Sequence, residues 1–316
     1  MGDSQRNLIS GDAELKVQVP KDYLRGPIFA SCKQKVGRTI VIKKCDKIYE
    51  IGGFEPIPGT GKPCPALDIR HGRALFTMLT FYKSSVEDEP AKIRFSLKQF
   101  CKRYANVSSS VGGKDIKVIK ELLSDLLNCW FRVTHPNGEK ICYRILTRVV
   151  IRSKSRSREE LWLDEVELDP EFYKLLTDYT ELSGIDLKVL ASISSALAQA
   201  IYVYIPSRIV YRTEENRFEI GLINLLREVG HTVPSHKSLR KQLFTQNKKC
   251  VIDQLDGLPF MRGILRVNLA ETKDCDDYKL LFWNGNVKAS ISKQKKLDTF
   301  APKLKNCWLK SRNKQN

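Results

Sequence analysis

The chain has 316 residues, a length that predicts two domains of ordinary size. Hydrophobic residues make up 42% of it and charged residues 28%, so the composition supports a sizeable core and excludes a chain disordered throughout. The 54 Lys and Arg residues against 36 Asp and Glu give a net charge of +18, which indicates a polyanionic partner, with nucleic acid ahead of an anionic membrane surface.

Several protein classes are excluded by local features. The N-terminus has no apolar run, so a secretory signal is not expected. The least charged stretch, residues 189–205, is shorter than the roughly twenty residues that span a bilayer. The 9 cysteines include no C-x-x-C pair and several lie in apolar patterns. We therefore expect reduced thiols in a cytoplasmic protein with no membrane contact, rather than disulfides or a zinc site.

The first 65 residues are expected to form an N-terminal extension. Residues 1–20 lack periodicity and should be loose. Residues 38–51 predict a β-hairpin, and a connector rich in Pro and Gly follows over 52–65. The connector resembles the end of a phosphate-binding P-loop, but Pro56 replaces the first glycine and Pro63 the magnesium-binding Ser or Thr, so we exclude nucleotide binding there.

A first domain is predicted over residues 66–180. Its pattern indicates three helices, then two strands around a Pro-Asn-Gly turn, then a basic loop and a further strand. The expected helices span 66–82, 96–104 and 114–127, and the expected strands span 130–134, 140–151 and 161–168.

A second domain over residues 181–284 is predicted to repeat this order. A long apolar helix should be stopped by Pro206, and two helices and two strands should follow. The expected helices span 187–205, 218–229 and 235–255, the expected strands span 263–269 and 278–283, and a Lys-rich tail occupies 285–316.

Both blocks thus follow one plan: helix, helix, turn, helix, β-hairpin. That plan is typical of a winged helix, in which the third helix enters the major groove of DNA. The predicted fold class is therefore α+β, with two tandem winged-helix domains (helix-turn-helix plus β-hairpin).

The helix expected over 114–127 presents lysines on a sector away from its apolar face. Gly112 and Gly113 precede it and would let a phosphate approach the free N–H groups of the helix start. The preceding helix adds cations, and such positioning helices also contact phosphates. The candidate DNA-binding residues are Lys98, Lys102, Arg103, Lys114, Lys117 and Lys120. The alternative is a solvated polar face on a core helix.

The helix expected over 235–255 has a more varied polar side. Arg can fork to guanine and Gln to adenine, so this mixture suits base reading better than the lysines of the first block. Its candidate DNA-binding residues are Lys237, Arg240, Lys241, Gln242 and Lys248. A surface helix that keeps the protein soluble is the alternative.

The loop between the expected strands of the first block is strongly basic. A flexible basic loop beside a hairpin is what a wing on the phosphate backbone requires. Its candidate residues are Arg152, Lys154, Arg156 and Arg158, and a solubilising loop is the alternative.

Catalytic patterns are missing from the sequence. Its 4 histidines form no H-x-H or H-E-x-x-H motif and no Cys/His cluster, and no G-x-S-x-G is present. No Asp/Glu pair is set against a helical apolar run, as a nuclease metal site would require. The sequence therefore predicts no enzyme, no cofactor and no metal site.

Three stretches resemble the winged-helix initiators of plasmid replication, of the TrfA and iteron-binding type. Residues 95–104 with 112–127 are similar to that family's helix pair with a glycine loop between. Residues 165–176 resemble the strand-to-helix passage after the first wing, and 193–211 the long helix that opens the second winged helix. By element order the likeness covers roughly residues 66–283.

This resemblance implies binding of double-stranded DNA with directly repeated origin sites, local melting of the origin, and recruitment of the host replicative helicase or its loader. It also implies a balance between monomer and homodimer. Three other functions stay open: a winged-helix transcriptional regulator, a nucleic-acid-processing enzyme such as a primase or nuclease, and a chromosome-compacting protein.

Overall fold

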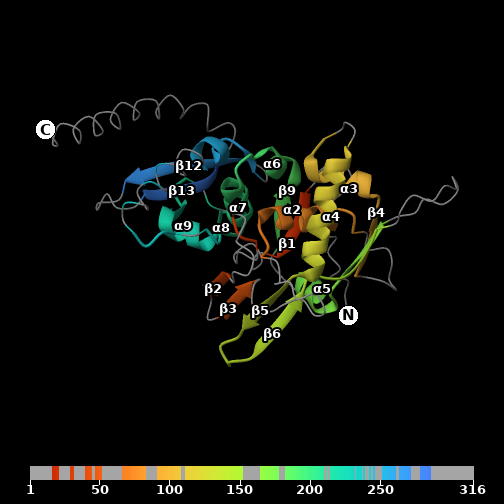
Figure 1. Cartoon of the computed structure of the whole chain (residues 1–316). Coiled ribbons are helices and arrows are strands. Elements are labelled where there is room, and N and C mark those ends of the chain that lie inside the picture. Colours follow the sequence, from red (N-terminus) through yellow and green to blue (C-terminus); the bar gives the residue numbers. More distant parts are fainter. Residues whose placement is uncertain are drawn as a thin grey trace, which may run out of the picture.

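The structure is a computed structural model of the whole chain (Figure 1). Helices and strands are mixed along it, in agreement with the expected α+β class. The structure describes residues 16–20, 29–31, 40–44, 47–51, 66–82, 91–107, 111–151, 164–177, 182–209, 212, 214–231, 233–236, 238, 242, 245, 251–260, 263–271 and 278–285.

The first unit, from α2 to α5, combines four helices with a three-stranded antiparallel sheet of order β4-β8-β7. The strand that precedes the helix pair therefore lies beside the last strand of the following pair. The elements of this unit are α2 (Ile69–Leu79), β4 (Lys92–Phe95), α3 (Leu97–Ala105), α4 (Gly113–Asn128), β7 (Leu146–Val150), β8 (Asp164–Leu168) and α5 (Pro170–Thr177).

The second unit, from α6 to β13, repeats that arrangement in a sheet of order β10-β13-β12-β11. Ser238, Gln242, Thr245 and residues 251–255 are helical, in line with the helix expected over 235–255. The other elements are α6 (Leu187–Ser192), α7 (Ala196–Tyr204), α8 (Pro206–Ile209), β10 (Phe218–Gly221), α9 (Leu222–Glu228), β11 (Pro259–Phe260), β12 (Gly263–Glu271) and β13 (Tyr278–Gly285).

Strands from the N-terminal extension complete two further sheets. The hairpin expected over 38–51 is confirmed, and it joins the first unit in a sheet of order β2-β3-β5-β6. Residues 16–20 are not loose as expected, since they form β1, which pairs with β9 just before α6. These strands are β1 (Lys16–Pro20), β2 (Ile40–Lys44), β3 (Lys47–Ile51), β5 (Trp130–Thr134), β6 (Lys140–Arg144) and β9 (Leu182–Asp186).

The single strand expected over 140–151 is wrong, because the chain bends at Ile145 and forms two strands. β6 pairs with β5, whereas β7 pairs with β8 in another sheet. Ile145 and Leu146 are both fully buried, and neighbouring residues of a straight strand cannot face the same side. The bend allows both side chains to be buried, because it takes the chain from the sheet that contains β5 and β6 into the sheet that contains β7 and β8.

The long helix expected over 187–205 is also wrong. It is interrupted after Ser192, and Ser195 starts α7 by accepting a hydrogen bond from the Ala198 N–H at 3.4 Å. The Gln199 amide donates to the freed Ile193 carbonyl at 2.7 Å, which compensates for the break. Pro206 opens α8 rather than ending the helical path, because the first helical position needs no N–H.

The helix expected over 218–229 begins later than its pattern indicates. Residues 218–221 form β10 on the edge of the second sheet, and only α9 is helical. Gly221 caps α9, and its extended backbone allows the change from strand to helix. The apolar residues of this stretch belong partly to a strand and partly to a helix. Their spacing alone does not show where the strand ends and the helix begins.

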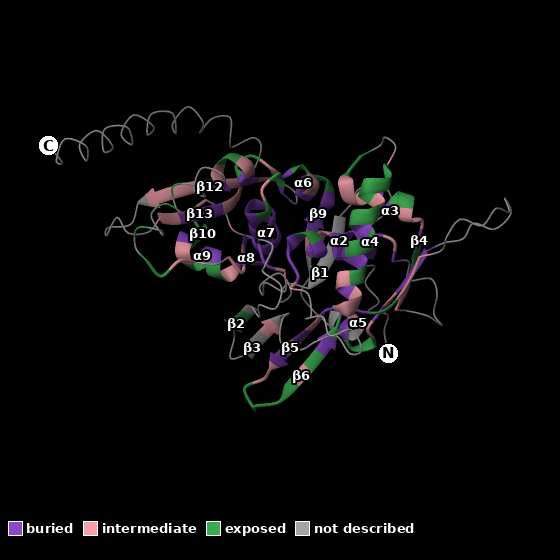
Figure 2. Cartoon of the chain, in the orientation of Figure 1, coloured by how far each residue is buried: buried purple, intermediate pink, exposed green. Residues whose placement is uncertain are grey.

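One apolar core runs through both units. α2 and α7 are almost entirely buried at its centre, as the purple ribbons in Figure 2 show. Residues 29–31 link the units: the Ala30 N–H donates to the Leu67 carbonyl and the Ser31 N–H to the Val229 carbonyl, both at 3.0 Å. The domain boundaries proposed from the sequence stay predictions.

The close approach of β12 and β13 leaves no room for a side chain at Gly263. A Cβ there would clash with Asn284 Oδ1 and would lie 2.7 Å from the Gly285 carbonyl. We expect Gly263→Ala to lower the free energy of urea unfolding by about 1–3 kcal/mol. Gly113→Ala is the control, since no atom lies within 4 Å of that Cβ, and it should leave stability unchanged or slightly raised. Equal stability of both variants would contradict this packing.

Candidate nucleic-acid interface

α4 is the exposed helix of the first unit, and its sequence fixes which side faces the core. Ile119, Leu122, Leu123 and Leu126 recur at helical spacing and are buried against α2, α3 and β7. At its start, the Asp115 carboxylate accepts a hydrogen bond from the Gly112 N–H at 3.1 Å, and its charge offsets the positive end of the helix. The opposite face is left to solvent.

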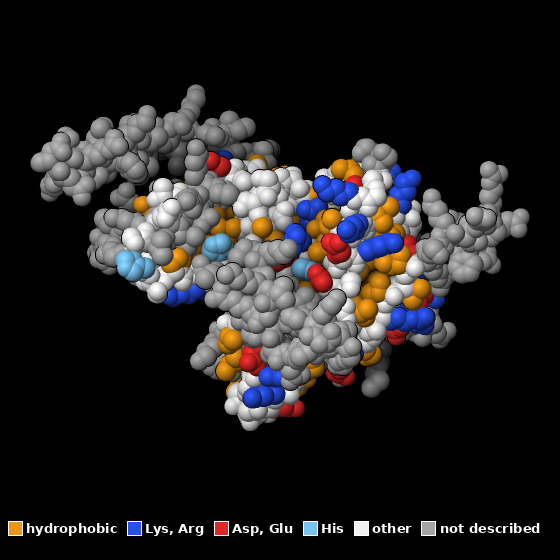
Figure 3. Space-filling view, viewed as in Figure 1, with side chains coloured by type: hydrophobic (Ala, Val, Ile, Leu, Met, Phe, Trp, Pro, Cys, Tyr) orange, Lys and Arg blue, Asp and Glu red, His pale blue; other side chains and the backbone are white. Residues whose placement is uncertain are grey.

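The predicted lysines of α4 lie on that exposed face. Lys114, Lys117 and Lys120 are exposed, and none forms an ion pair with another residue that the structure describes. All three stand in the N-terminal half of the helix, where the helix dipole also favours an anion. Figure 3 shows Lys and Arg side chains gathered over α3 and α4.

Two of the three cations predicted on α3 extend this surface. Lys98 is exposed and Lys102 is half-buried one turn later. The spacing of four residues places both on one side of the helix. Lys98 and Lys102 thus lie on a helix that packs against α4, and their contact with a phosphate backbone stays a prediction.

Arg103, the third cation predicted on α3, contacts α2 instead. Its Nη1 donates to the carbonyl and the Oγ1 of Thr80 at 3.0 and 3.1 Å, and its guanidinium lies 4.1 Å from the ring centroid of Phe81. Because Thr80 caps α2, the charge of Arg103 also stabilises the negative end of that helix. DNA contact by Arg103 stays a prediction.

Arg73 makes the reciprocal contact from α2 to α3. Its Nε donates to the Tyr104 carbonyl at 2.9 Å, its Nη2 donates to the same oxygen, and its guanidinium lies 4.0 Å from the Tyr104 ring centroid. Burial lowers the pKa of Arg73 from its usual value, although a guanidinium stays charged near neutral pH. We call Arg73 and Arg103 the arginine clamp; each caps the C-terminus of the other's helix.

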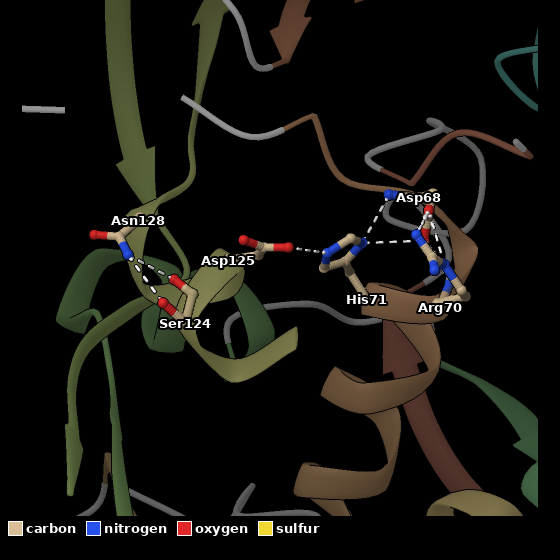
Figure 4. Close-up of polar contacts among 6 residues, drawn as sticks. All are labelled: Asp68, Arg70, His71, Ser124, Asp125 and Asn128. Carbon is tan, nitrogen blue, oxygen red and sulfur yellow. Dashed lines mark hydrogen bonds and ion pairs between the residues drawn. The ribbon is translucent and has the colours of Figure 1, made fainter. Parts of the chain in front are cut away.

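A buried histidine joins α2 to α4 (Figure 4). His71 Nδ1 lies 3.0 Å from Asp68 Oδ1, and its Nε2 lies 3.1 Å from Asp125 Oδ2 on α4. Asp68 precedes α2, caps it by accepting from the Arg70 N–H at 2.9 Å, and pairs with the Arg70 guanidinium at 2.6 Å. A protonated imidazole can donate to both carboxylates, whereas in a neutral ring Nδ1 can accept from the Asp68 N–H, 3.0 Å away, while Nε2 donates to Asp125.

The charges around this histidine favour its protonated form. Burial by itself disfavours the imidazolium, but hydrogen bonds to Asp125 and Asp68 outweigh it, and the pKa of His71 is raised above its usual value. Burial likewise disfavours the Asp68 carboxylate, yet the hydrogen bonds from His71 and Arg70 hold its pKa well below the usual range. His71 thus links α4 to the start of α2.

The helix of the second unit that is predicted to read bases is described in part. Gln242 is helical and exposed, as predicted, whereas Lys237, Arg240, Lys241 and Lys248 lie outside the described residues. The end of the helix is anchored: Gln254 Oε1 accepts from the Ser195 N–H at 2.9 Å, and Asp256 Oδ1 accepts from the Val267 N–H at 3.0 Å.

The predicted wing residues Arg152, Lys154, Arg156 and Arg158 also lie outside the described residues. The strands on either side are described, and Val150 on β7 pairs with Glu165 on β8 in an antiparallel pair. Glu165 also pairs with Arg94 at 3.0 Å and with Arg148 at 3.7 Å, which ties β8 to its two neighbouring strands.

The arginine clamp and the His71 contacts were not found from the sequence. Asp68 and His71 have the three-residue spacing of a helix cap, but Asp125 lies 54 residues further along the chain than His71. Searching the histidines for metal motifs gave no indication of a structural role.

Within the described residues, no group of three or more His, Cys, Asp or Glu side chains is placed to hold a metal ion. None of the described helices is long and apolar enough to cross a membrane.

Comparison with solved structures reveals a fold that this chain shares with a known protein. No protein-family model matches the chain, and no curated protein matches it. A crystal structure of domains 2 and 3 of RctB, as selenomethionine derivatives, aligns with a TM-score of 0.55 at 14% identity and covers 84% of this chain and 98% of that one. At this identity the likeness shows a shared fold, and a fold alone does not define a function.

Two other structures align less well. A second crystal structure of RctB domains 2–3 has a TM-score of 0.49 at 12% identity and covers 83% of this chain and 96% of its own. The Pi initiator protein in complex with iteron DNA has a TM-score of 0.38 at 14% identity and covers 76% and 97%. Of these three alignments, the first RctB structure is the one that supports a shared fold.

The His71 contacts predict a pH-dependent stability. Because folding raises the pKa of His71, its contribution is complete below the unfolded pKa of about 6.5 and is lost as pH rises through the folded pKa. The difference in unfolding free energy between the wild type and His71→Gln should therefore be larger at about pH 6 than at about pH 9. His236→Gln is an exposed control. A difference that grows with pH would contradict a charged His71.

The arginine clamp predicts that Arg103 contributes to stability and that Lys98 does not. Arg103→Lys keeps the charge but loses the planar guanidinium that lies over Phe81 while its Nη1 donates to Thr80, so it should cost about 1–3 kcal/mol of unfolding free energy. Lys98→Gln, at an exposed position of the same helix, should change stability by less than about 0.5 kcal/mol. Equal effects in thermal unfolding would show that Arg103 is not held by α2.

Proposed function

We propose that the protein is a replication initiator that binds repeated sites in double-stranded DNA through two winged-helix units. The observation that carries the proposal is the repeated topology: a strand, a helix pair and a strand pair form sheets of order β4-β8-β7 and β10-β13-β12. In a winged helix the second helix of such a pair enters the major groove and the loop of the strand pair follows the backbone.

The charge distribution supports duplex DNA as the partner of the first unit. Lys114, Lys117 and Lys120 project from the helix that would enter the groove, and Lys98 and Lys102 extend the positive surface over the preceding helix. In the second unit, Gln242 is exposed on the corresponding helix. Lys237, Arg240, Lys241 and Lys248 are proposed to bind there, and Arg152, Lys154, Arg156 and Arg158 to form the first wing.

Two DNA-reading units in one chain favour an initiator over a transcriptional regulator. A regulator ordinarily combines one winged helix per protomer with a sensing domain, whereas both units here have the DNA-binding plan. Successive units can occupy successive major grooves, which suits directly repeated sites of about one helical turn or more. We assign the chain no catalytic step.

Other parts of the proposal come from the sequence resemblance to plasmid initiators. They are local melting of the origin, recruitment of the host replicative helicase or its loader, and a balance between monomer and homodimer. A cytoplasmic location fits these roles.

Binding should be specific for repeated duplex sites and strongly dependent on salt. If about six or more phosphates are neutralised, a plot of log affinity against log salt concentration should have a slope of about −5 or steeper. Footprinting on DNA that flanks the protein's own gene should reveal evenly spaced repeats. A single palindromic site would favour the regulator, equal affinity for any duplex would favour compaction, and metal-dependent nicking or primer synthesis would favour the enzyme. A slope near zero would exclude nucleic-acid binding.

A further inference from the structure

The exposed face of α4 is chemically mixed. Lys114, Lys117, Val118 and Glu121 occupy the positions i, i+3, i+4 and i+7 of the helix, so they form one continuous strip, and all four are exposed. We call these four residues the α4 strip. It lies in the N-terminal half of the helix, the part that meets base edges when such a helix enters the major groove.

Val118 has no role in the core of the protein. Its exposed fraction is 40%, and it is one of 3 large hydrophobic residues that are exposed among those described. Valine is also a poorer helix former than the long polar residues that usually occupy such a position. Neither packing nor helix propensity therefore explains an aliphatic side chain beside Lys114 and Lys117.

Glu121 is equally unexplained by contacts within the protein. Lys117 stands one turn before it, yet Glu121 forms no ion pair with any residue in the part of the chain that the structure describes. A carboxylate on a surface that binds a polyanion weakens binding by repulsion. A helix that contacted only phosphates would gain nothing from Glu121 or from Val118.

The major groove offers a partner for each of them. Thymine presents its C5 methyl group there, which an aliphatic side chain can contact, and cytosine presents its N4 amino group, which a carboxylate can accept from. Lysine can contact phosphate or the O6 and N7 acceptors of guanine. The side chains of the α4 strip can thus contact three different bases: thymine, cytosine and guanine.

We propose that α4 reads DNA sequence, with Val118 against a thymine methyl and Glu121 accepting from a cytosine amino group. The strip extends from Lys114 to Glu121, about 10 Å along the helix axis, which corresponds to roughly three base pairs. This inference rests on the proposed function and goes beyond it: α4 adds specificity, and the lysines that surround Val118 hold the helix in place.

The test begins by selecting binders for the full chain from a library of duplexes with about twenty randomised base pairs, two helical turns. In the selected duplex, each thymine is then replaced singly by uracil, which removes only the methyl group. One replacement should weaken wild-type binding about fourfold, the effect of one buried methyl group. Val118→Ala should abolish the penalty at that position. Val41→Ala, at another exposed valine, should retain it.

The second arm concerns Glu121. Glutamine is nearly isosteric but pairs with adenine, so Glu121→Gln should move the preference at one position from cytosine to adenine by roughly fivefold to a hundredfold. Glu215→Gln, at an exposed glutamate outside α4, should select the wild-type sequence. Circular dichroism of each variant verifies that the helix is intact.

The outcomes separate this inference from the proposed function. If the library yields no preferred duplex, the proposed function fails. If the wild type selects a site but uracil replacement and Glu121→Gln leave its base preferences unchanged, α4 does not read sequence and only this inference is overturned.

Discussion

The position of α4 depends on directional polar contacts to α2. Apolar packing of Leu122, Leu123 and Leu126 decides which face of α4 is buried, but it is non-directional and defines the exact rotation of the helix only loosely. His71, bonded to Asp68 at the start of α2 and to Asp125 on α4, supplies the missing direction. The direction in which the exposed lysines of α4 point depends on where this contact places the helix.

The protein uses its two kinds of cation differently. Arg73 and Arg103 point inward, where the planar guanidinium can hydrogen bond a carbonyl and stack on an aromatic ring at once. Lys98 and Lys117 remain exposed, as suits a strongly hydrated ammonium group that meets phosphates without rigid geometry. The net charge of the chain therefore overestimates the positive surface that a polyanion can contact, because some of the arginines hold helices together.

Local patterns predicted the elements whose apolar residues face one side throughout. The helices near 97–105 and 113–128 and the hairpin near 40–51 belong to this class, since a single periodicity describes each. The bend at Ile145 and the break after Ser192 were missed because tertiary packing decides them. Of the candidate interface, charge spacing located the lysines, but the contact between His71 and Asp125 joins residues that no local pattern relates.

The pairing of β1 with β9 affects how the chain acquires its fold. Lys16 lies opposite Asp186, so this sheet closes only after more than half of the chain is available. Such non-local pairing carries a large loop-closure entropy and is formed slowly. The hydrogen bond from the Ser31 N–H to the Val229 carbonyl joins residues that lie even further apart in the sequence. The two units should consequently unfold together in one cooperative transition, so damage to either would destabilise both.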